Sequence, residues 1–139
     1  MKEKPIVLIV DDQPDNLYMY SRYLETQARL GVITAMTGRE ALLKARRLKP
    51  DVILLDLSMP QMDGYEVARS LSLDPATKDI PVILVSAYAS EAEAARALGS
   101  AFASFVGSVA HGYVTKPCLP EVLLQHVQQA LPAPQAAAV

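Results

Sequence analysis

Short, continuous apolar runs recur along the chain, and they limit its fold more than any other feature. The clearest are Ile6 to Val10, Val52 to Leu55 and Val82 to Val85, which are rich in Val, Ile and Leu. Runs of this length without polar alternation are typical of strands buried on both faces. A weaker run, Val32 to Met36, and a short one, Tyr113 to Thr115, complete an expected set of five strands.

Between these runs the apolar spacing becomes helical. Leu17, Leu24 and Ala28 share one face of a first helix, which Pro14 can open because its fixed φ suits the first helical position. We expect a final helix with the same signals, carried by Pro120, Leu123, Val127 and Leu131.

Two further helix starts have capping-box spacing, Thr37 with Glu40 and Ser90 with Glu93. Asp63-Gly64-Tyr65 turns the chain into another helix, which we expect to end near Leu71. Strict alternation of strands and helices implies right-handed crossovers. The predicted fold class is therefore α/β, a doubly wound parallel sheet of five strands with five helices.

The size and charge of the chain indicate one domain. A chain of 139 residues with 51% hydrophobic residues is long enough for one hydrophobic core and too short for two domains with cores of ordinary size. We assign residues 1–131 to this domain and expect 132–139 to be a disordered tail or the start of a linker. The net charge of -2 gives no basic excess for a phosphate backbone, so we expect no direct nucleic-acid partner.

The sequence also predicts a cytoplasmic protein. Cys118 is the single cysteine and cannot form an internal disulfide. The first residues lead straight into a strand-sized run rather than the apolar region of a signal peptide. No apolar run approaches the length of a bilayer span, so we expect no membrane association.

Polar side chains stand where the expected strands end. Asp11 and Asp12 follow the first strand, Asp56 the third, Ser86 the fourth and Lys116 the fifth. The carboxyl ends of parallel strands meet at one edge of the sheet, where ligands bind. Three carboxylates would repel one another there unless a cation lay among them. Oxygen ligands of this type suit Mg²⁺.

The same edge offers partners for an anion. Lys116 brings a positive charge and Ser86 a hydroxyl, so a phosphoryl group fits beside the metal. Asp56 ends the central strand and is the carboxylate best placed to attack phosphorus. We therefore expect an acyl phosphate on Asp56.

Four segments make the chain resemble the receiver domains of response regulators in bacterial two-component systems. They are Val7 to Asp12, Asp56 to Gly64, Val85 to Ala87 and Thr115 to Pro117, in that order and spanning nearly the whole chain. The resemblance implies a flavodoxin-like, CheY-like fold. It implies a phosphorylation-dependent switch that receives its phosphoryl group from a histidine kinase or a phosphotransfer protein. Such a module catalyses only its own phosphorylation and slow dephosphorylation.

The resemblance also implies the roles of the metal ligands. Asp12 and Asp56 would bind Mg²⁺ through their side chains, and Asp11 would act mostly through water. Ser58 would offer its backbone carbonyl. These four residues form the expected metal site.

The remaining roles concern the phosphoryl group and the response to it. By resemblance, Ser86 would bind one phosphoryl oxygen and Lys116 another. Pro117 would follow a cis peptide that aims Lys116 inward. Tyr113 would turn inward on activation, so that Ser86 and Tyr113 together form the switch.

One segment departs from the family. The chain from Ser86 to Lys116 is roughly eight residues longer than is usual for a receiver, and the excess lies between Ala95 and Val109. An apolar helical stripe there could extend the fourth helix or break into two helices. Phe102, Phe105 and Val106 carry the apolar area, which either a symmetric homodimer or a local core within the monomer would cover.

Two other functions compete with signalling. A Mg²⁺-dependent phosphatase also forms an aspartyl phosphate, but that class has a second Asp two residues after the nucleophile, where Ser58 stands. A nucleotide-binding module would have a glycine-rich turn after the first strand, where Asp11 to Pro14 stand. Signalling is the preferred interpretation.

Overall fold

The computed structural model describes residues 4–57, 64–87, 93, 96 and 110–131. Within them, five parallel strands form one sheet in the order β2-β1-β3-β4-β5. The strands are β1 (Ile6–Val10), β2 (Gly31–Ala35), β3 (Val52–Asp56), β4 (Val82–Ser86) and β5 (Ala110–Thr115). This is the flavodoxin-like strand order, so the predicted fold class is confirmed.

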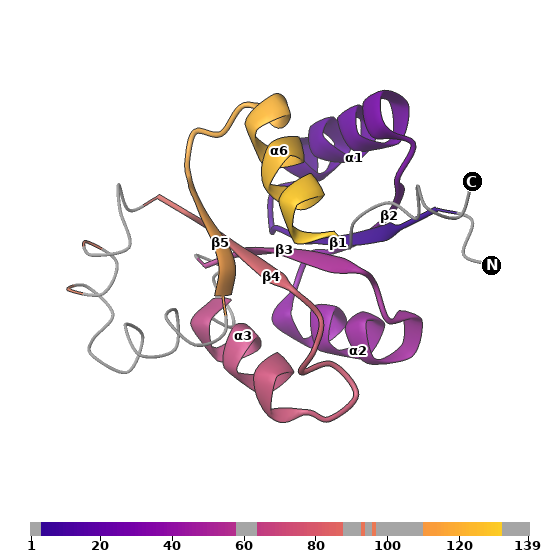
Figure 1. The fold of residues 1–139 in the computed structure, drawn as a ribbon. Coiled ribbons are helices and arrows are strands. Elements are labelled where there is room, and N and C mark those ends of the chain that lie inside the picture. The colour runs from indigo at the N-terminus through magenta and orange to yellow at the C-terminus, as the bar shows by residue number, and fades with distance from the viewer. Residues whose placement is uncertain (1–3, 58–63, 88–92, 94–95, 97–109, 132–139) are drawn as a thin grey trace.

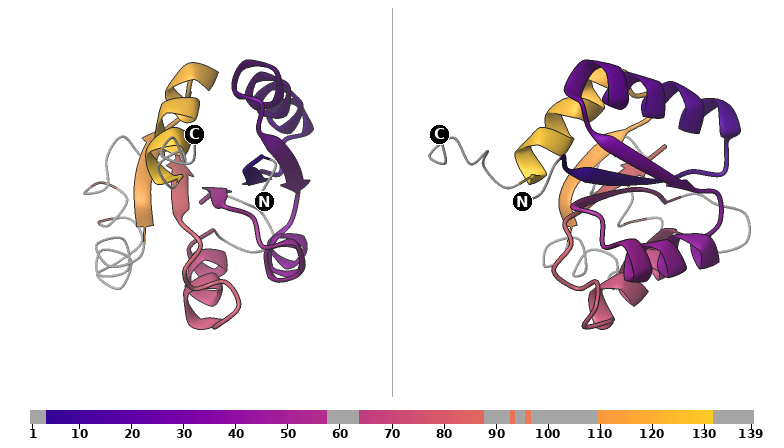
Figure 2. Two further views of the ribbon diagram at one scale, coloured as in Figure 1. Left: turned by 45° about the vertical axis from the view of Figure 1, so that its right-hand side comes forward. Right: turned by 90° about the vertical axis from the view of Figure 1, so that its right-hand side faces the viewer.

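Helices cover both faces of the sheet (Figures 1 and 2). α1 (Pro14–Ala28) and α6 (Pro120–Ala130) lie on one face, and α2 (Gly38–Leu48) and α3 (Gly64–Leu73) lie on the other. The helix expected between β4 and β5, with its extension, falls almost entirely on residues 88–92, 94–95 and 97–109, outside the described residues. Of the described helices, none is long and apolar enough to cross a bilayer.

The central strands divide the core into two layers. In β1, Leu8 and Val10 pack toward α2 and α3, whereas Val7 and Ile9 pack toward α1 and α6. All five residues of β3 are buried, as its continuous apolar run predicted. The edge strand β2 buries only Ala35, which explains why its run is weaker. It also starts and ends one residue earlier than expected.

The helix starts follow the local signals of the sequence. Pro14 and Pro120 open α1 and α6 as predicted. Thr37 caps α2, because its side chain accepts a hydrogen bond from the Glu40 backbone N–H at 3.1 Å. Glu40 reaches back one residue further than a capping box requires and accepts from the Met36 N–H at 2.9 Å. The other expected box begins at Ser90, outside the described residues.

The start of α3 lies against the end of β3 and requires glycine. A Cβ atom on Gly64 would be 2.2 Å from the backbone oxygen of Asp56 and 2.4 Å from the Cα of Leu57. The Gly64 N–H instead donates to the Leu57 carbonyl at 3.0 Å. This close approach fixes the backbone just beyond Asp56.

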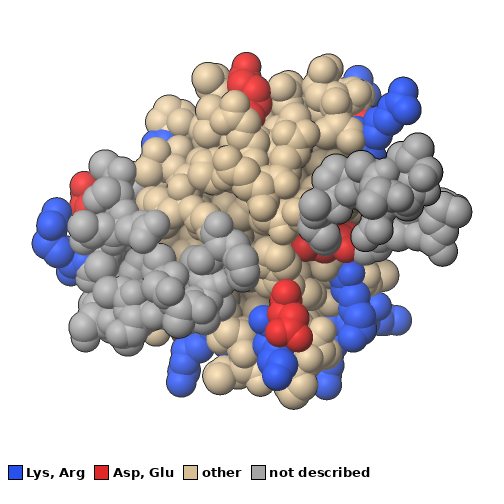
Figure 3. Space-filling model, in the orientation of Figure 1, with Lys and Arg blue, Asp and Glu red and all other residues tan. Residues whose placement is uncertain are grey.

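Basic side chains gather on the side of the molecule that carries α2 and α3 (Figure 3). Arg46 and Arg47 lie in the last turn of α2. Cations in that position complement the partial negative charge of a helix C-terminus. Helix electrostatics therefore accounts for part of this grouping.

The cap of α2 gives a stability prediction. Thr37→Ala removes the acceptor for the Glu40 N–H, so the free energy of unfolding should fall by about 1 kcal/mol. Urea denaturation followed by circular dichroism measures this free energy of unfolding. Thr26→Ala is the matched control. The exposed Thr26 hydroxyl donates only to the Arg22 carbonyl within α1, and alanine is the better helix former, so the free energy of unfolding should not fall. Equal stability of Thr37→Ala and the parent would contradict the assigned cap.

Candidate functional site

The carboxyl ends of β1 and β3 bring three carboxylates together. Asp11 follows β1 directly and Asp56 ends β3, and these strands are neighbours in the sheet. One ligand oxygen from each of Asp11, Asp12 and Asp56 can be chosen so that all lie within 4.8 Å of one another. Asp11 and Asp56 are buried, with 4% and 2% of their surface exposed, and Asp12 is half-buried. The structure therefore gathers the carboxylates that the strand ends predicted.

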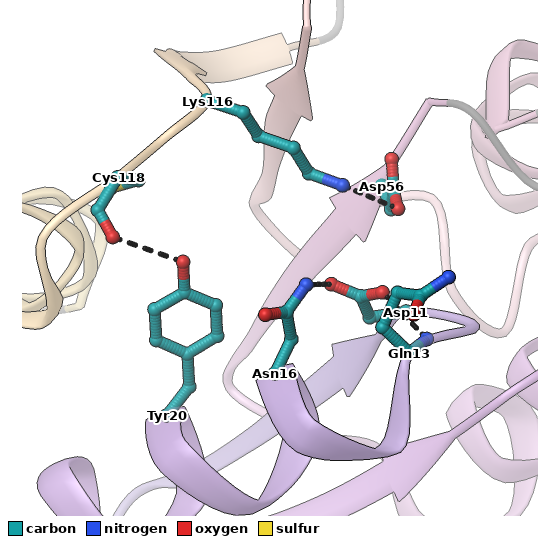
Figure 4. A network of polar contacts seen from close by, with 7 residues as sticks. All are labelled: Asp11, Gln13, Asn16, Tyr20, Asp56, Lys116 and Cys118. Atoms are coloured by element: carbon teal, nitrogen blue, oxygen red, sulfur yellow. Dashed lines mark hydrogen bonds and ion pairs between the residues drawn. The ribbon is translucent and has the colours of Figure 1, made fainter.

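The N-cap and first turn of α1 hold Asp11 in place (Figure 4). Its Oδ1 accepts a hydrogen bond from the Gln13 backbone N–H at 2.9 Å, and its Oδ2 accepts from the Asn16 side-chain amide at 3.2 Å. These neutral donors fix the carboxylate and leave its charge in the site. Asn16 is a contributor that the analysis of strand ends did not reveal, since it lies on a helix.

Lys116 brings the positive charge of the site. Its Nζ lies 2.8 Å from Asp56 Oδ2, and 27% of its side chain is exposed (Figure 4). Partial burial lowers the pKa of Lys116, but the hydrogen bond to Asp56 and the nearby charges of Asp11 and Asp12 outweigh it. The pKa therefore lies above its ordinary value. The Lys116 side chain remains an ammonium group.

The backbone around Lys116 joins the site to β4. The Lys116 N–H donates to the Ser86 carbonyl at 2.7 Å, and the Lys116–Pro117 peptide bond is cis, as the resemblance implies. Ser86 is fully buried at the end of β4. Tyr113 is half-buried in β5 and packs against the core cluster on the α2 and α3 side. Ser58, the expected source of a carbonyl ligand, lies outside the described residues.

Tyr20 is a second residue near the site that the sequence analysis did not single out. It lies on α1, and its hydroxyl donates to the Cys118 carbonyl at 3.0 Å (Figure 4). Burial raises the pKa of Tyr20, and the nearby Cys118, Asp11 and Asp56 raise it further. Its spacing from Leu17 and Leu24 puts it on the inward face, a signal that was available in the sequence.

Comparisons with known proteins agree with this geometry. The family model of the response regulator receiver domain matches residues 7–128. Protein PilH of Pseudomonas aeruginosa is 34% identical over 125 residues, 90% of this chain and 96% of PilH. Response regulator PleD of Caulobacter vibrioides is 41% identical over 100 residues, 72% of this chain but only 22% of PleD.

A solved structure shows the same architecture. Chemotaxis response regulator CheY4 of Vibrio cholerae matches with a TM-score of 0.79 and 33% identity, covering 93% of this chain and 100% of that one. The family match includes Asp11, Asp12, Asp56 and Lys116. The chain therefore belongs to the response regulator receiver domain family.

Proposed function

We propose that this receiver domain accepts its phosphoryl group on Asp56, beside a Mg²⁺ ion held by the neighbouring carboxylates. Receiver domains are signalling switches that accept a phosphoryl group rather than enzymes that turn over a separate substrate. One observation carries the assignment of the acceptor. The Asp56 carboxylate is bonded to the Lys116 ammonium at 2.8 Å within the carboxylate cluster.

Asp56 is a better acceptor than its two neighbours. Both oxygens of Asp11 accept hydrogen bonds, one from Gln13 at the N-cap of α1 and one from Asn16 in its first turn. Asp12 is more exposed than either of the others. Asp56 lies on the central strand and contacts the cation that can balance charge on an incoming phosphoryl group. These differences favour Asp56 as the nucleophile.

The carboxylate cluster suits magnesium. Asp11, Asp12 and Asp56 offer hard oxygen ligands close to one another, which Mg²⁺ prefers. The Ser58 backbone carbonyl would complete the expected protein ligands. When bound, Mg²⁺ offsets the negative charge shared by the acceptor and the phosphoryl oxygens. Because Asp11 and Asp56 are buried, their negative charges are poorly solvated, and a bound cation would stabilise them.

The transfer step needs no proton from Asp56, because its carboxylate is the nucleophile. An Asp56 oxygen forms the new bond to phosphorus while the bond from phosphorus to the donor breaks, and the leaving group keeps that electron pair. Lys116 would then pair with one phosphoryl oxygen and Ser86 with another. Tyr113 would respond by turning inward.

The family membership supports the remaining parts of the proposal. The donor would be a histidine kinase or a phosphotransfer protein, in the cytoplasm. The receiver domain would comprise residues 1–131, since the family match ends at residue 128 and α6 ends at Ala130. The two alternatives for Phe102 and Phe105, a symmetric homodimer or a local core within the monomer, depend on residues outside the described ranges. The family match favours signalling over the phosphatase alternative.

Replacement of the acceptor tests the proposal. With a small acyl phosphate and Mg²⁺, the parent should gain one phosphoryl mass by intact-protein mass spectrometry. Asp56→Asn keeps the shape of the side chain but removes the nucleophile, so labelling should vanish. Asp15→Asn, on the exposed first turn of α1, is the matched control and should label like the parent. Unchanged labelling of Asp56→Asn would refute the assignment.

Removal of a metal ligand gives a second prediction. Chelation of Mg²⁺ should stop labelling of the parent. Asp12→Asn should raise the Mg²⁺ concentration for half-maximal labelling by about tenfold or more, because one ligand charge is lost. The same Asp15→Asn control should leave that concentration unchanged. Labelling that persists in excess chelator would show that the carboxylates serve another purpose.

A further inference from the structure

Tyr20 links two parts of the fold that are far apart in sequence. Its side chain is 7% exposed and belongs to the core cluster between the sheet and the helices α1 and α6. Its hydroxyl leaves this apolar layer and donates to the Cys118 carbonyl, 98 residues further along the chain. A buried hydroxyl needs such a partner, so this bond fixes α1 to that one backbone position.

The Cys118 carbonyl that Tyr20 binds lies in the same segment as Lys116. β5 ends at Thr115 and α6 begins at Pro120, so residues 116–119 form the whole connection. The Lys116 N–H is bonded to the Ser86 carbonyl at 2.7 Å, and the Cys118 carbonyl is bonded to Tyr20 at 3.0 Å. The connection is thus anchored to β4 at its first residue and to α1 at its third.

This anchoring bears on the chemistry because a lysine side chain is long and flexible. Its ammonium group must stay beside Asp56, at 2.8 Å, and meet an incoming phosphoryl oxygen. We propose that Tyr20 is a positioning residue, which holds the connection so that Lys116 points at the acceptor. The inference rests on the proposed roles of Asp56 and Lys116.

Two further observations support a role close to the site. Tyr20 lines a small cavity together with Asp11 and Asp56, so its side chain borders the same space as these two carboxylates. A tyrosine hydroxyl ionises only at about pH 10, so Tyr20 is a hydrogen-bond donor at neutral pH. The hydrogen bond to the Cys118 carbonyl consequently persists under the conditions of phosphorylation.

Deletion of the hydroxyl alone tests the inference. Tyr20→Phe keeps the ring and its packing, and Tyr23→Phe removes a hydroxyl from the same helix as a matched control. With acyl phosphate as the donor, the maximal labelling rate of Tyr20→Phe should fall about fivefold, the cost of one lost positioning hydrogen bond. The Mg²⁺ concentration for half-maximal rate should stay unchanged, because the carboxylates are untouched. Tyr23→Phe should behave like the parent.

A double-mutant cycle separates positioning from general packing. If Tyr20 acts through Lys116, then Tyr20→Phe should have no further effect on the labelling rate in a Lys116→Ala background. The same fold-reduction in both backgrounds, or a parent-like rate for Tyr20→Phe, would overturn the inference. All rates are measured below the thermal melting range of each variant. Failure of the proposed function would look different, because Asp56→Asn would then label like the parent.

Discussion

Repulsion among the three clustered carboxylates is the constraint on which the rest of this site depends. The parallel pairing of β1 with β3 brings Asp11 and Asp56 to one edge, and both are buried. Within the described part of the chain, Lys116 contacts Asp56, so the three carboxylates there outnumber the one ammonium group beside them. A site with this imbalance of charge favours a further cation, which would also reduce the repulsion between the carboxylates and a phosphoryl group.

Each charged group is fixed by a different element of the fold. The N-cap and first turn of α1 bind Asp11, and the close approach of Gly64 in α3 to the end of β3 fixes the backbone beyond Asp56. The backbone of β4 and the Tyr20 hydroxyl hold the connection that carries Lys116. The geometry of the site therefore depends on the whole sheet and on helices from both of its faces, which suits a domain that must transmit a local chemical change.

Much of this arrangement could be predicted from the sequence, because the signals are local. Buried strands appear as continuous apolar runs, and the residues that end them must share an edge once the strands are parallel. The hydrogen bond of Tyr20 could not be predicted. Its partner is a backbone carbonyl far away in the sequence, and a backbone carbonyl gives no residue-specific signal. Asn16 was missed for a related reason, because a polar residue in a first helical turn is ordinarily a solvated one.

Chemical mapping of the phosphoryl group tests whether Asp56 is the acceptor. Borohydride reduces an aspartyl phosphate to homoserine, so the protein is labelled with acyl phosphate and Mg²⁺, reduced, digested and sequenced by tandem mass spectrometry. We expect homoserine at position 56 of the parent, and none there when Mg²⁺ is chelated. Homoserine at position 11 or 12, or at position 56 to the same extent without Mg²⁺, would contradict it.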